Sequence, residues 1–210
     1  MSELACGTGS TCCYLGKNGF QVHGIDLIST PVVSARKQAQ TMLVSQNTRF
    51  LCADLFKLPL GFDSKMIDQL ISIQEASGKN EHPTNIQETP LQSEYLYDMC
   101  FDCSCWHILR HDNETHLVTL YERSLKPGGL LFILAGRLTE DLTADDIAKG
   151  MPRTEMKDIE NAFSKDKWEY LWVKPSLFDM TDVYAKEKEA YRSCWWILLR
   201  KRTHSAALYS

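Results

Sequence analysis

A glycine-rich turn at the start of the chain constrains the fold more than any other feature. Residues 3–10 read Glu-Leu-Ala-Cys-Gly-Thr-Gly-Ser, a strand end that runs into a turn and then into a helix. Gly7 and Gly9 have no Cβ atom, so the backbone can take positive φ angles and a ligand can approach it closely. The helix that follows points its free N–H groups toward the same place. The sequence therefore predicts an α/β sheet that binds a nucleotide-like ligand at this turn.

The segments that follow alternate between helix and strand patterns. Residues 11–17 predict a short helix, and residues 20–26 alternate apolar and polar side chains as a strand does. Thr30 is a suitable N-cap and Pro31 suits the first helical position, so we expect a helix to begin there. Residues 49–53 predict a third strand. This order of strands and helices implies a parallel sheet with right-handed crossovers.

The second half of the chain continues the same pattern. Asn113 is a suitable N-cap for a helix that the Lys-Pro-Gly-Gly segment at residues 126–129 would end. Residues 130–135 are continuously apolar, as in a strand buried on both faces. Other expected elements are a helix at residues 156–163, polar stretches with helical character at 138–152 and 181–191, and strands at 97–102, 168–173 and 194–199.

Residues 61–94 interrupt this alternation. Apolar side chains between residues 66 and 73 are compatible with one helix, and residues 77–93 are rich in Gly, Asn, Pro, Thr, Gln and Glu. A polar loop of that length is either functional or mobile. We interpret residues 61–94 as a polar insertion in a single domain that spans residues 1–203, followed by a disordered tail at 204–210.

Composition limits the partners that the chain can have. A net charge of −4 and a pI near 5.9 argue against a general nucleic-acid binder, which usually has a basic face. No apolar run approaches the roughly 20 residues that span a bilayer, and no signal-peptide pattern is visible. Eight cysteines in 210 residues are too few for a disulfide scaffold and suit a reducing compartment. We therefore expect a cytoplasmic monomer that binds neither nucleic acid nor membrane.

Three acidic residues follow three of the predicted strands: Asp26, Asp54 and Asp102. In a doubly wound sheet these strand ends converge on one crevice. A carboxylate after the second strand can accept hydrogen bonds from both hydroxyls of a ribose, and one after the third strand can accept from an adenine amino group. Each aspartate alone is compatible with a helix cap or a loop. Their joint placement indicates a cofactor that contains adenosine.

Two common classes of nucleotide site fit the turn poorly. A dinucleotide site has a third small residue, Gly or Ala, in the pattern G-x-G-x-x-G/A, whereas Gly9 is followed by Ser10, Thr11 and Cys12. A P-loop requires Gly-Lys followed by Ser or Thr, and the sequence contains no such segment. Nicotinamide cofactors and nucleoside triphosphates are therefore disfavoured.

Several segments together resemble the motifs of class I S-adenosylmethionine-dependent methyltransferases. Residues 3–9 are similar to motif I, Asp26 matches the ribose-binding acid, and residues 53–55 resemble the segment that contacts adenine. Residues 97–103 resemble the fourth-strand motif, and residues 125–129 the turn before strand five. The stretch from Phe101 to His107 and the C-terminal layout look most like the thiopurine methyltransferase-like and related small-molecule branch.

The resemblance implies both a fold and a set of cofactor contacts. The implied fold is a Rossmann-like, doubly wound, seven-stranded sheet of order 3-2-1-4-5-7-6, with the last strand antiparallel. The implied cofactor is S-adenosylmethionine, and no metal is expected. Ala5 stands where the family usually has the first glycine of motif I. The predicted cofactor contacts are Glu3, Ala5, Cys6, Gly7, Gly9, Asp26, Leu27, Ala53, Asp54, Leu55, Asp102 and Cys103.

The family transfers a methyl group from a sulfonium to a nucleophile, chiefly by holding the reacting atoms in line. A base is needed only when the nucleophile carries a proton. Because residues after the fourth strand line the site in this family, Trp106, His107 and Arg110 are the candidate substrate contacts. His107 is the candidate base, with a structural role as the alternative, and Trp106 could serve as a packing wall, a recognition element or both.

The segment Cys-x-x-Cys-x-Cys-x-His at residues 100–107 contains residue types that bind zinc. On a strand, however, Cys100 and Cys103 would point to opposite faces. No second Cys/His pair with zinc-finger spacing accompanies them. We therefore interpret these cysteines as structural.

Motif I lies at the very start of the sequence. The first strand would keep about three residues, fewer than the usual 5–6, so we expect an N-terminally truncated domain with uncovered apolar surface. Three functions stay open at this point. The chain could methylate a small-molecule nucleophile such as a thiol, it could be a truncated or non-catalytic methyltransferase-like protein, or it could methylate a protein that the 61–94 insertion recognises.

Overall fold

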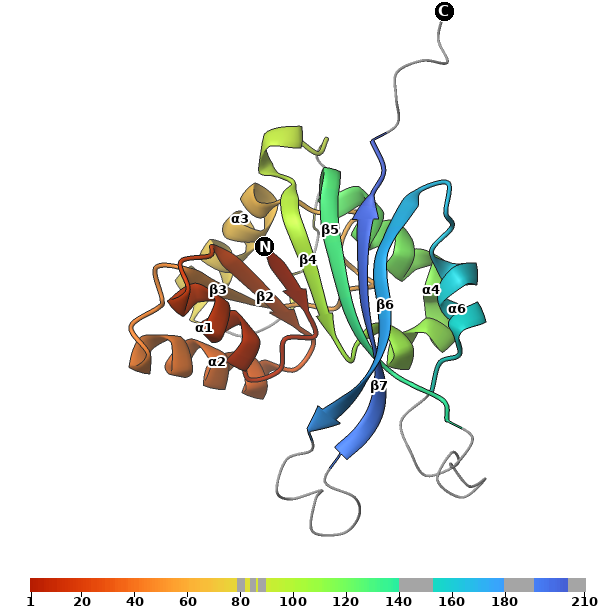
Figure 1. Cartoon of the computed structure of the whole chain (residues 1–210). Coiled ribbons are helices and arrows are strands. Elements are labelled where there is room, and N and C mark those ends of the chain that lie inside the picture. Colours follow the sequence, from red (N-terminus) through yellow and green to blue (C-terminus); the bar gives the residue numbers. More distant parts are fainter. Residues whose placement is uncertain (79–81, 84–85, 87–89, 140–152, 180–190, 204–210) are drawn as a thin grey trace, which may run out of the picture.

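Seven strands form one mixed sheet with helices on both faces in the computed structural model (Figure 1), which describes residues 1–78, 82–83, 86, 90–139, 153–179 and 191–203. The strand order is β3-β2-β1-β4-β5-β7-β6, and β7 runs antiparallel to β5 and β6, which confirms the prediction. The strands are β1 (Ser2–Leu4), β2 (Val22–Asp26), β3 (Thr48–Cys52), β4 (Tyr97–Cys103), β5 (Leu125–Gly136), β6 (Trp168–Asp179) and β7 (Tyr191–Lys201). The helices are α1 (Ser10–Lys17), α2 (Ser29–Thr41), α3 (Ser64–Ser77), α4 (Trp106–Ser124) and α6 (Met156–Ala162), with a 3-10 turn η1 (Ser93–Tyr95).

The helices cover both faces of the sheet, and each face has its own hydrophobic cluster. Helices α1 and α2 pack on β2 and β3 through small side chains such as Cys12 and Ala35. These side chains belong to one hydrophobic cluster with Phe50. Helices α3, α4 and α6 cover the other face, where Ile67 and Leu117 belong to a larger cluster. Both faces of the parallel strands β1–β3 are thus covered, as buried parallel strands require.

An aromatic cluster lies on the part of the sheet formed by β4, β5, β6 and β7. Cys100 points into the larger hydrophobic cluster, so Phe101, its neighbour along β4, points to the opposite face. There Phe101 stacks on Phe132 with ring centroids 4.6 Å apart, and Phe132 lies 5.8 Å from Trp172 and 6.0 Å from Trp196. In Figure 1 no helix of the described residues covers this part of the face, and Trp196 stays 42% exposed.

Strand β1 is only three residues long, yet it pairs with both of its neighbours. Its residues are in register with residues 23–25 of β2 and 100–102 of β4. Side chains connect the strands where β1 begins: His23 Nδ1 lies 2.8 Å from the hydroxyl of Tyr97, and His23 Nε2 lies 3.2 Å from a carboxylate oxygen of Asp68. These contacts link β2, β4 and α3 beside the short central strand.

Helix α2 begins earlier than its N-cap pattern predicts. The helix starts at Ser29 with Ile28 as the cap, so Thr30 already lies inside it. The reason is local, because the Asp26 carboxylate accepts the N–H of Ile28 at 2.9 Å and turns the chain directly after the strand.

Helix α4 also begins earlier, at Trp106 instead of Asn113. The capping signal at Asn113 is nevertheless used. This residue has a non-helical conformation (φ −161°, ψ 71°) inside the helix, and its side-chain oxygen accepts the N–H of His116 at 3.2 Å. Asn113 therefore caps the second part of a kinked helix.

Residues 61–94 contain the one helix that the apolar side chains between residues 66 and 73 predict. Residues 64–77 form α3, whose side chains Met66, Ile67, Leu70 and Ile71 are buried in the larger cluster. The side chain of Asp63 caps this helix by accepting the N–H of Met66 at 2.8 Å. Helix α3 is thus the crossover that follows β3, and it lies on the same face as α4.

The remaining expectations concern strand lengths and the ends of loops. Strand β5 includes residues 126–129, which the sequence predicts as a turn. Strand β6 ends later than predicted, at Asp179, and strand β7 begins earlier than predicted, at Tyr191. Residues 140–152, 180–190 and 204–210 lie outside the described residues. They include most of the two predicted polar stretches, at 138–152 and 181–191, and all of the predicted tail. Among the described helices, none is long and apolar enough to cross a bilayer.

Candidate functional site

The strand order reverses between β1 and β4, and in open α/β sheets ligands bind at such a point, outside the carboxyl ends of the strands. Two residues at these ends hold a left-handed backbone without being glycine: Ala5, just after β1, has φ 53°, and Ser104, just after β4, has φ 71°. Backbone strain of this kind concentrates at functional sites. The edge between β1 and β4 is therefore the candidate site.

The two glycines of the turn have different surroundings. Gly9 has φ 74° and is the N-cap of α1, and a Cβ atom there would lie 2.7 Å from the Phe50 ring and 2.8 Å from Ala35. Gly7 has φ 53°, and a Cβ atom there would meet nothing within 4 Å. Gly9 is required for packing beneath the turn, whereas the space over Gly7 is open to a ligand.

Asp26 joins the turn to the end of β2. One carboxylate oxygen accepts the N–H of Gly7 at 2.8 Å, and the other accepts the N–H of Ile28 at 2.9 Å. Each oxygen keeps a second lone pair for a ligand hydroxyl. Beside it, Leu27 and Ile28 are 52% and 58% exposed. The arrangement offers hydrogen-bond acceptors for a ribose and an apolar surface for a flat ring.

Glu3 is a buried residue of strand β1, directly before the glycine turn. It is 2% exposed, and the Cys12 thiol donates a hydrogen bond to its Oε2 atom at 2.8 Å. Burial raises the pKa of Glu3 to about 7, and the nearby Asp102 carboxylate acts in the same direction. Near neutral pH this carboxyl group therefore changes between its neutral and charged forms.

Glu3→Gln is expected to reduce the pH dependence of stability. Burial moves the pKa of Glu3 from 4.5 to about 7, so the folded chain binds more protons in this range, and stability falls as pH rises through it. The total loss from this residue is about 3 kcal/mol, of which about 1 kcal/mol falls between pH 6 and pH 8. Urea midpoints of wild type and variant at these two values measure the difference. Parallel pH profiles would contradict the assignment.

Asp102 lies in the interior, away from the open edge. It is fully buried, and its carboxylate accepts the N–H of Cys105 at 2.9 Å, the N–H of Trp106 at 3.0 Å and the hydroxyl of Tyr121. Burial raises the pKa of Asp102 to about 6. This carboxylate is therefore bonded inside the protein, at the start of α4, and a contact between Asp102 and the cofactor stays a prediction.

The segment after β3 offers fewer side chains than the sequence predicts. Ala53 and Leu55 are buried in the larger hydrophobic cluster, so only their main chain is available to a ligand. Asp54 is partly exposed, accepts the N–H of Phe56 at 3.0 Å and lies 3.6 Å from the Lys57 ammonium. A contact between Asp54 and adenine stays a prediction, as do the predicted contacts of Cys6 and of the half-buried Cys103.

The three predicted substrate contacts are mostly enclosed. Trp106 is fully buried, with its ring centroid 5.5 Å from that of Phe163, and is part of the core. His107 is also buried, and neither of its ring nitrogens has a hydrogen-bond partner among the residues that the structure describes. Burial and the charges of Arg153 and Arg110 lower the pKa of His107 to about 4, so the ring is neutral at pH 7. Arg110 is held by Asp158 at 3.3 Å.

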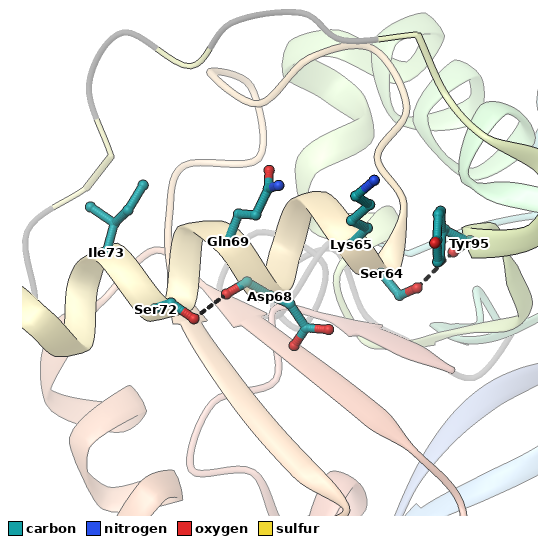
Figure 2. Close-up of a pocket in the computed structure, with 7 residues that line it drawn as sticks. All are labelled: Ser64, Lys65, Asp68, Gln69, Ser72, Ile73 and Tyr95. Atoms are coloured by element: carbon teal, nitrogen blue, oxygen red, sulfur yellow. Dashed lines mark hydrogen bonds between the residues drawn. The ribbon is translucent and has the colours of Figure 1, made fainter.

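A separate groove of about 710 Å³ runs along α3. Figure 2 shows Ser64, Lys65, Gln69 and Ile73 on its surface, while Asp68 points away toward the sheet, where it pairs with Arg49 and His23. The groove contains no residue predicted to bind the cofactor, so it is distinct from the site at the strand ends. The lining residues are Ser64, Lys65, Asp68, Gln69, Ser72, Ile73 and Tyr95.

Three residues of the site were not predicted from the sequence. Ile28 follows Asp26 as an exposed apolar residue, and the apolar pair after the strand-end acid could have indicated it. Cys12 was interpretable only as core packing, because its contact with Glu3 depends on how α1 lies over β1. The positive φ of Ser104 has no signal in residue type. Within the described residues, no group of three or more His, Cys, Asp or Glu side chains could hold a metal ion.

Comparison with known proteins bears on the domain and the fold. Residues 2–77 match the family described as a methyltransferase domain. This match covers the N-terminal part of the chain, from β1 to α3. The domain supports S-adenosylmethionine as the cofactor, and the residues at the strand ends fit it, since Asp26 suits the ribose and the space over Gly7 is open. No curated protein matches the sequence.

Solved structures share the fold of this chain at low sequence identity. A protein from work on converting a disulfide bond into a thioacetal group in echinomycin biosynthesis aligns with a TM-score of 0.67 and 18% identity, over 97% of this chain and 76% of the other. A methyltransferase from Methanosarcina mazei aligns at 0.66 and 14%, over 97% and 92%. Magnesium protoporphyrin IX methyltransferase from Synechocystis with bound SAH aligns at 0.62 and 16%, over 96% and 73%.

Proposed function

We propose that the protein transfers the methyl group of S-adenosylmethionine to a small-molecule nucleophile, with a thiol as the first acceptor to test. The observation that carries the proposal is the glycine turn at the switch point of the sheet. There the Gly7 backbone is open to a ligand and is held by the Asp26 carboxylate at 2.8 Å. This is the arrangement that a cofactor with a ribose and a charged methionine end requires.

The residues of the chain serve mainly to bind and orient. S-adenosylmethionine supplies the activated methyl group on its sulfonium, and transfer to a thiolate forms a carbon–sulfur bond and leaves S-adenosylhomocysteine. Asp26 binds the ribose hydroxyls, and the apolar side chains of Leu27 and Ile28 cover the adenine. A thiol with a pKa of about 8.5 is partly ionised to the thiolate at neutral pH, so no dedicated base is needed. His107 and Arg110 are the proposed residues on the acceptor side.

Two observations support a thiol as the methyl acceptor. The protein related to echinomycin biosynthesis belongs to work on chemistry at sulfur, and it has the highest TM-score among the three structures compared. The buried His107, with its pKa lowered to about 4, is a weak base, which suits a nucleophile that ionises readily. Methyl transfer to a panel of thiols, phenols, amines and whole-cell protein, followed by release of S-adenosylhomocysteine, distinguishes a small-molecule acceptor from a protein acceptor.

Calorimetric titration of the 210-residue chain with S-adenosylmethionine tests the cofactor assignment. We expect binding by the wild type, and affinity about 30-fold lower for Asp26→Ala, which corresponds to about 2 kcal/mol for lost hydrogen bonds to a charged group. Asp98→Ala is the matched control, because Asp98 is 79% exposed at the amino end of β4 and should not affect binding. Absence of wild-type binding at millimolar ligand would refute the proposed activity for this chain.

A further inference from the structure

Cys12 contacts Glu3 across the interface between helix α1 and strand β1. The thiol is fully buried, and its sulfur lies 2.8 Å from Oε2 of Glu3. Glu3 is itself 2% exposed and stands in the middle of the central strand. A buried carboxylate is costly unless it receives hydrogen bonds, so this donor has a large influence on where the carboxylate points and on its charge.

We propose that Cys12 is a positioning residue that orients the Glu3 carboxylate toward the positively charged methionine end of the cofactor. The inference rests on the methyl-transfer function proposed above. Besides Thr11 and the main chain of Cys12, which also donate to this carboxylate, the thiol donates its one proton to Oε2. It is also neutral, and therefore it fixes the direction of the carboxylate without cancelling the negative charge that attracts a cation.

The surroundings of Glu3 favour this role. The strongest influences on its pKa, among the described residues, are burial, hydrogen bonds from Cys12 and Thr11, and the charge of Asp102, and none of them is a cation. The Glu3 charge in turn raises the pKa of the Cys13 and Cys103 thiols, for which burial is the larger cause. Hydrogen bonding to Cys6 and burial raise the pKa of the Cys12 thiol well above its usual value, so Cys12 stays protonated and acts as a donor over the working pH range.

Two substitutions separate positioning from packing. Cys12→Ala removes the donor, whereas Cys12→Ser keeps one donor at the same place. Affinity for S-adenosylmethionine, measured by calorimetry between pH 6 and pH 9, is expected to rise as Glu3 ionises, with a midpoint near pH 7 in the wild type and in Cys12→Ser. In Cys12→Ala we expect a midpoint about one pH unit higher and an affinity about 10-fold lower at pH 7. Cys13→Ala, a buried neighbour on the same helix, is expected to keep the wild-type midpoint.

A second measurement works without the cofactor. The carboxyl ¹³C shift of Glu3 reports its ionisation directly, and Glu3→Gln identifies the signal. A higher pKa in Cys12→Ala than in Cys12→Ser supports the coupling even if S-adenosylmethionine does not bind, in which case only the proposed function fails. Equal Glu3 pKa values in wild type and Cys12→Ala would overturn the inference. If Cys12→Ala does not fold, Cys12→Val, which is apolar and closer in volume, replaces it in both measurements.

Discussion

Replacing Gly9 with alanine is expected to destabilise the protein by about 4 kcal/mol, a large part of the roughly 5–15 kcal/mol that folded domains have. The φ angle of 74° alone costs an alanine about 1–2 kcal/mol. The new Cβ atom would also lie 2.7 Å from the Phe50 ring and 2.8 Å from Ala35, and overpacking of this kind costs about 1–3 kcal/mol. Urea unfolding followed by circular dichroism measures the change.

Gly7→Ala is the matched control for Gly9→Ala. Its φ angle of 53° carries a similar backbone cost, but the added Cβ atom meets nothing within 4 Å. We therefore expect a loss of only about 1 kcal/mol in stability, together with weaker cofactor binding because the methyl group fills the open space over the turn. Equal destabilisation by the two substitutions would show that the contacts with Phe50 and Ala35 are not what requires a glycine at position 9.

Asp102→Ala is expected to cost about 4 kcal/mol or to prevent folding. The Tyr121 hydroxyl and the N–H groups of Cys105 and Trp106 would lose their acceptor in a fully buried place, and each unsatisfied group costs about 1–3 kcal/mol. Chemical unfolding measures the loss. Asp98→Ala, on the same strand but exposed, is expected to change stability by less than about 0.5 kcal/mol.

Asp102→Asn separates the capping role from a contact with the cofactor. Asparagine keeps the shape and one acceptor oxygen, so a loss of about 2 kcal/mol is expected, with affinity for S-adenosylmethionine close to that of the wild type. Unchanged stability combined with at least a 30-fold loss of affinity would restore the cofactor contact that the sequence predicts and would contradict the capping role.

The parallel sheet and the glycine turn were predictable from the sequence because both depend on local patterns, whereas the strand order was implied by the resemblance to class I methyltransferases. The alternation of helices and strands with short connections restricts the topology, and the order β3-β2-β1-β4-β5-β7-β6 agrees with it. The position of Asp26 at the end of a strand also follows from chain order. Its bond to Gly7 N–H at 2.8 Å requires only that β1 and β2 be neighbours with their carboxyl ends together.

Helix boundaries and burial were less predictable. Two helices begin before their apparent N-caps, because Asp26 and Asp102 receive backbone N–H groups directly after their strands. Helix α3 is rich enough in polar residues to resemble an insertion, yet its apolar side chains lie in the main core. In each case a contact between elements outweighs the local propensity.

By itself, the sequence determined the fold class, the position of the turn and the acidic residues at the strand ends, since these depend on residue type and chain order. Only the tertiary structure decided how each of those acids is surrounded and bonded. Asp26 stays at the open edge, whereas Asp102, at an equivalent strand end, is enclosed by α4 and Tyr121. The same packing places Cys12 against Glu3, a contact between residues nine positions apart that depends on how α1 lies across β1. Burial and hydrogen bonding between elements set the roles of these groups, and neither can be read from residue spacing.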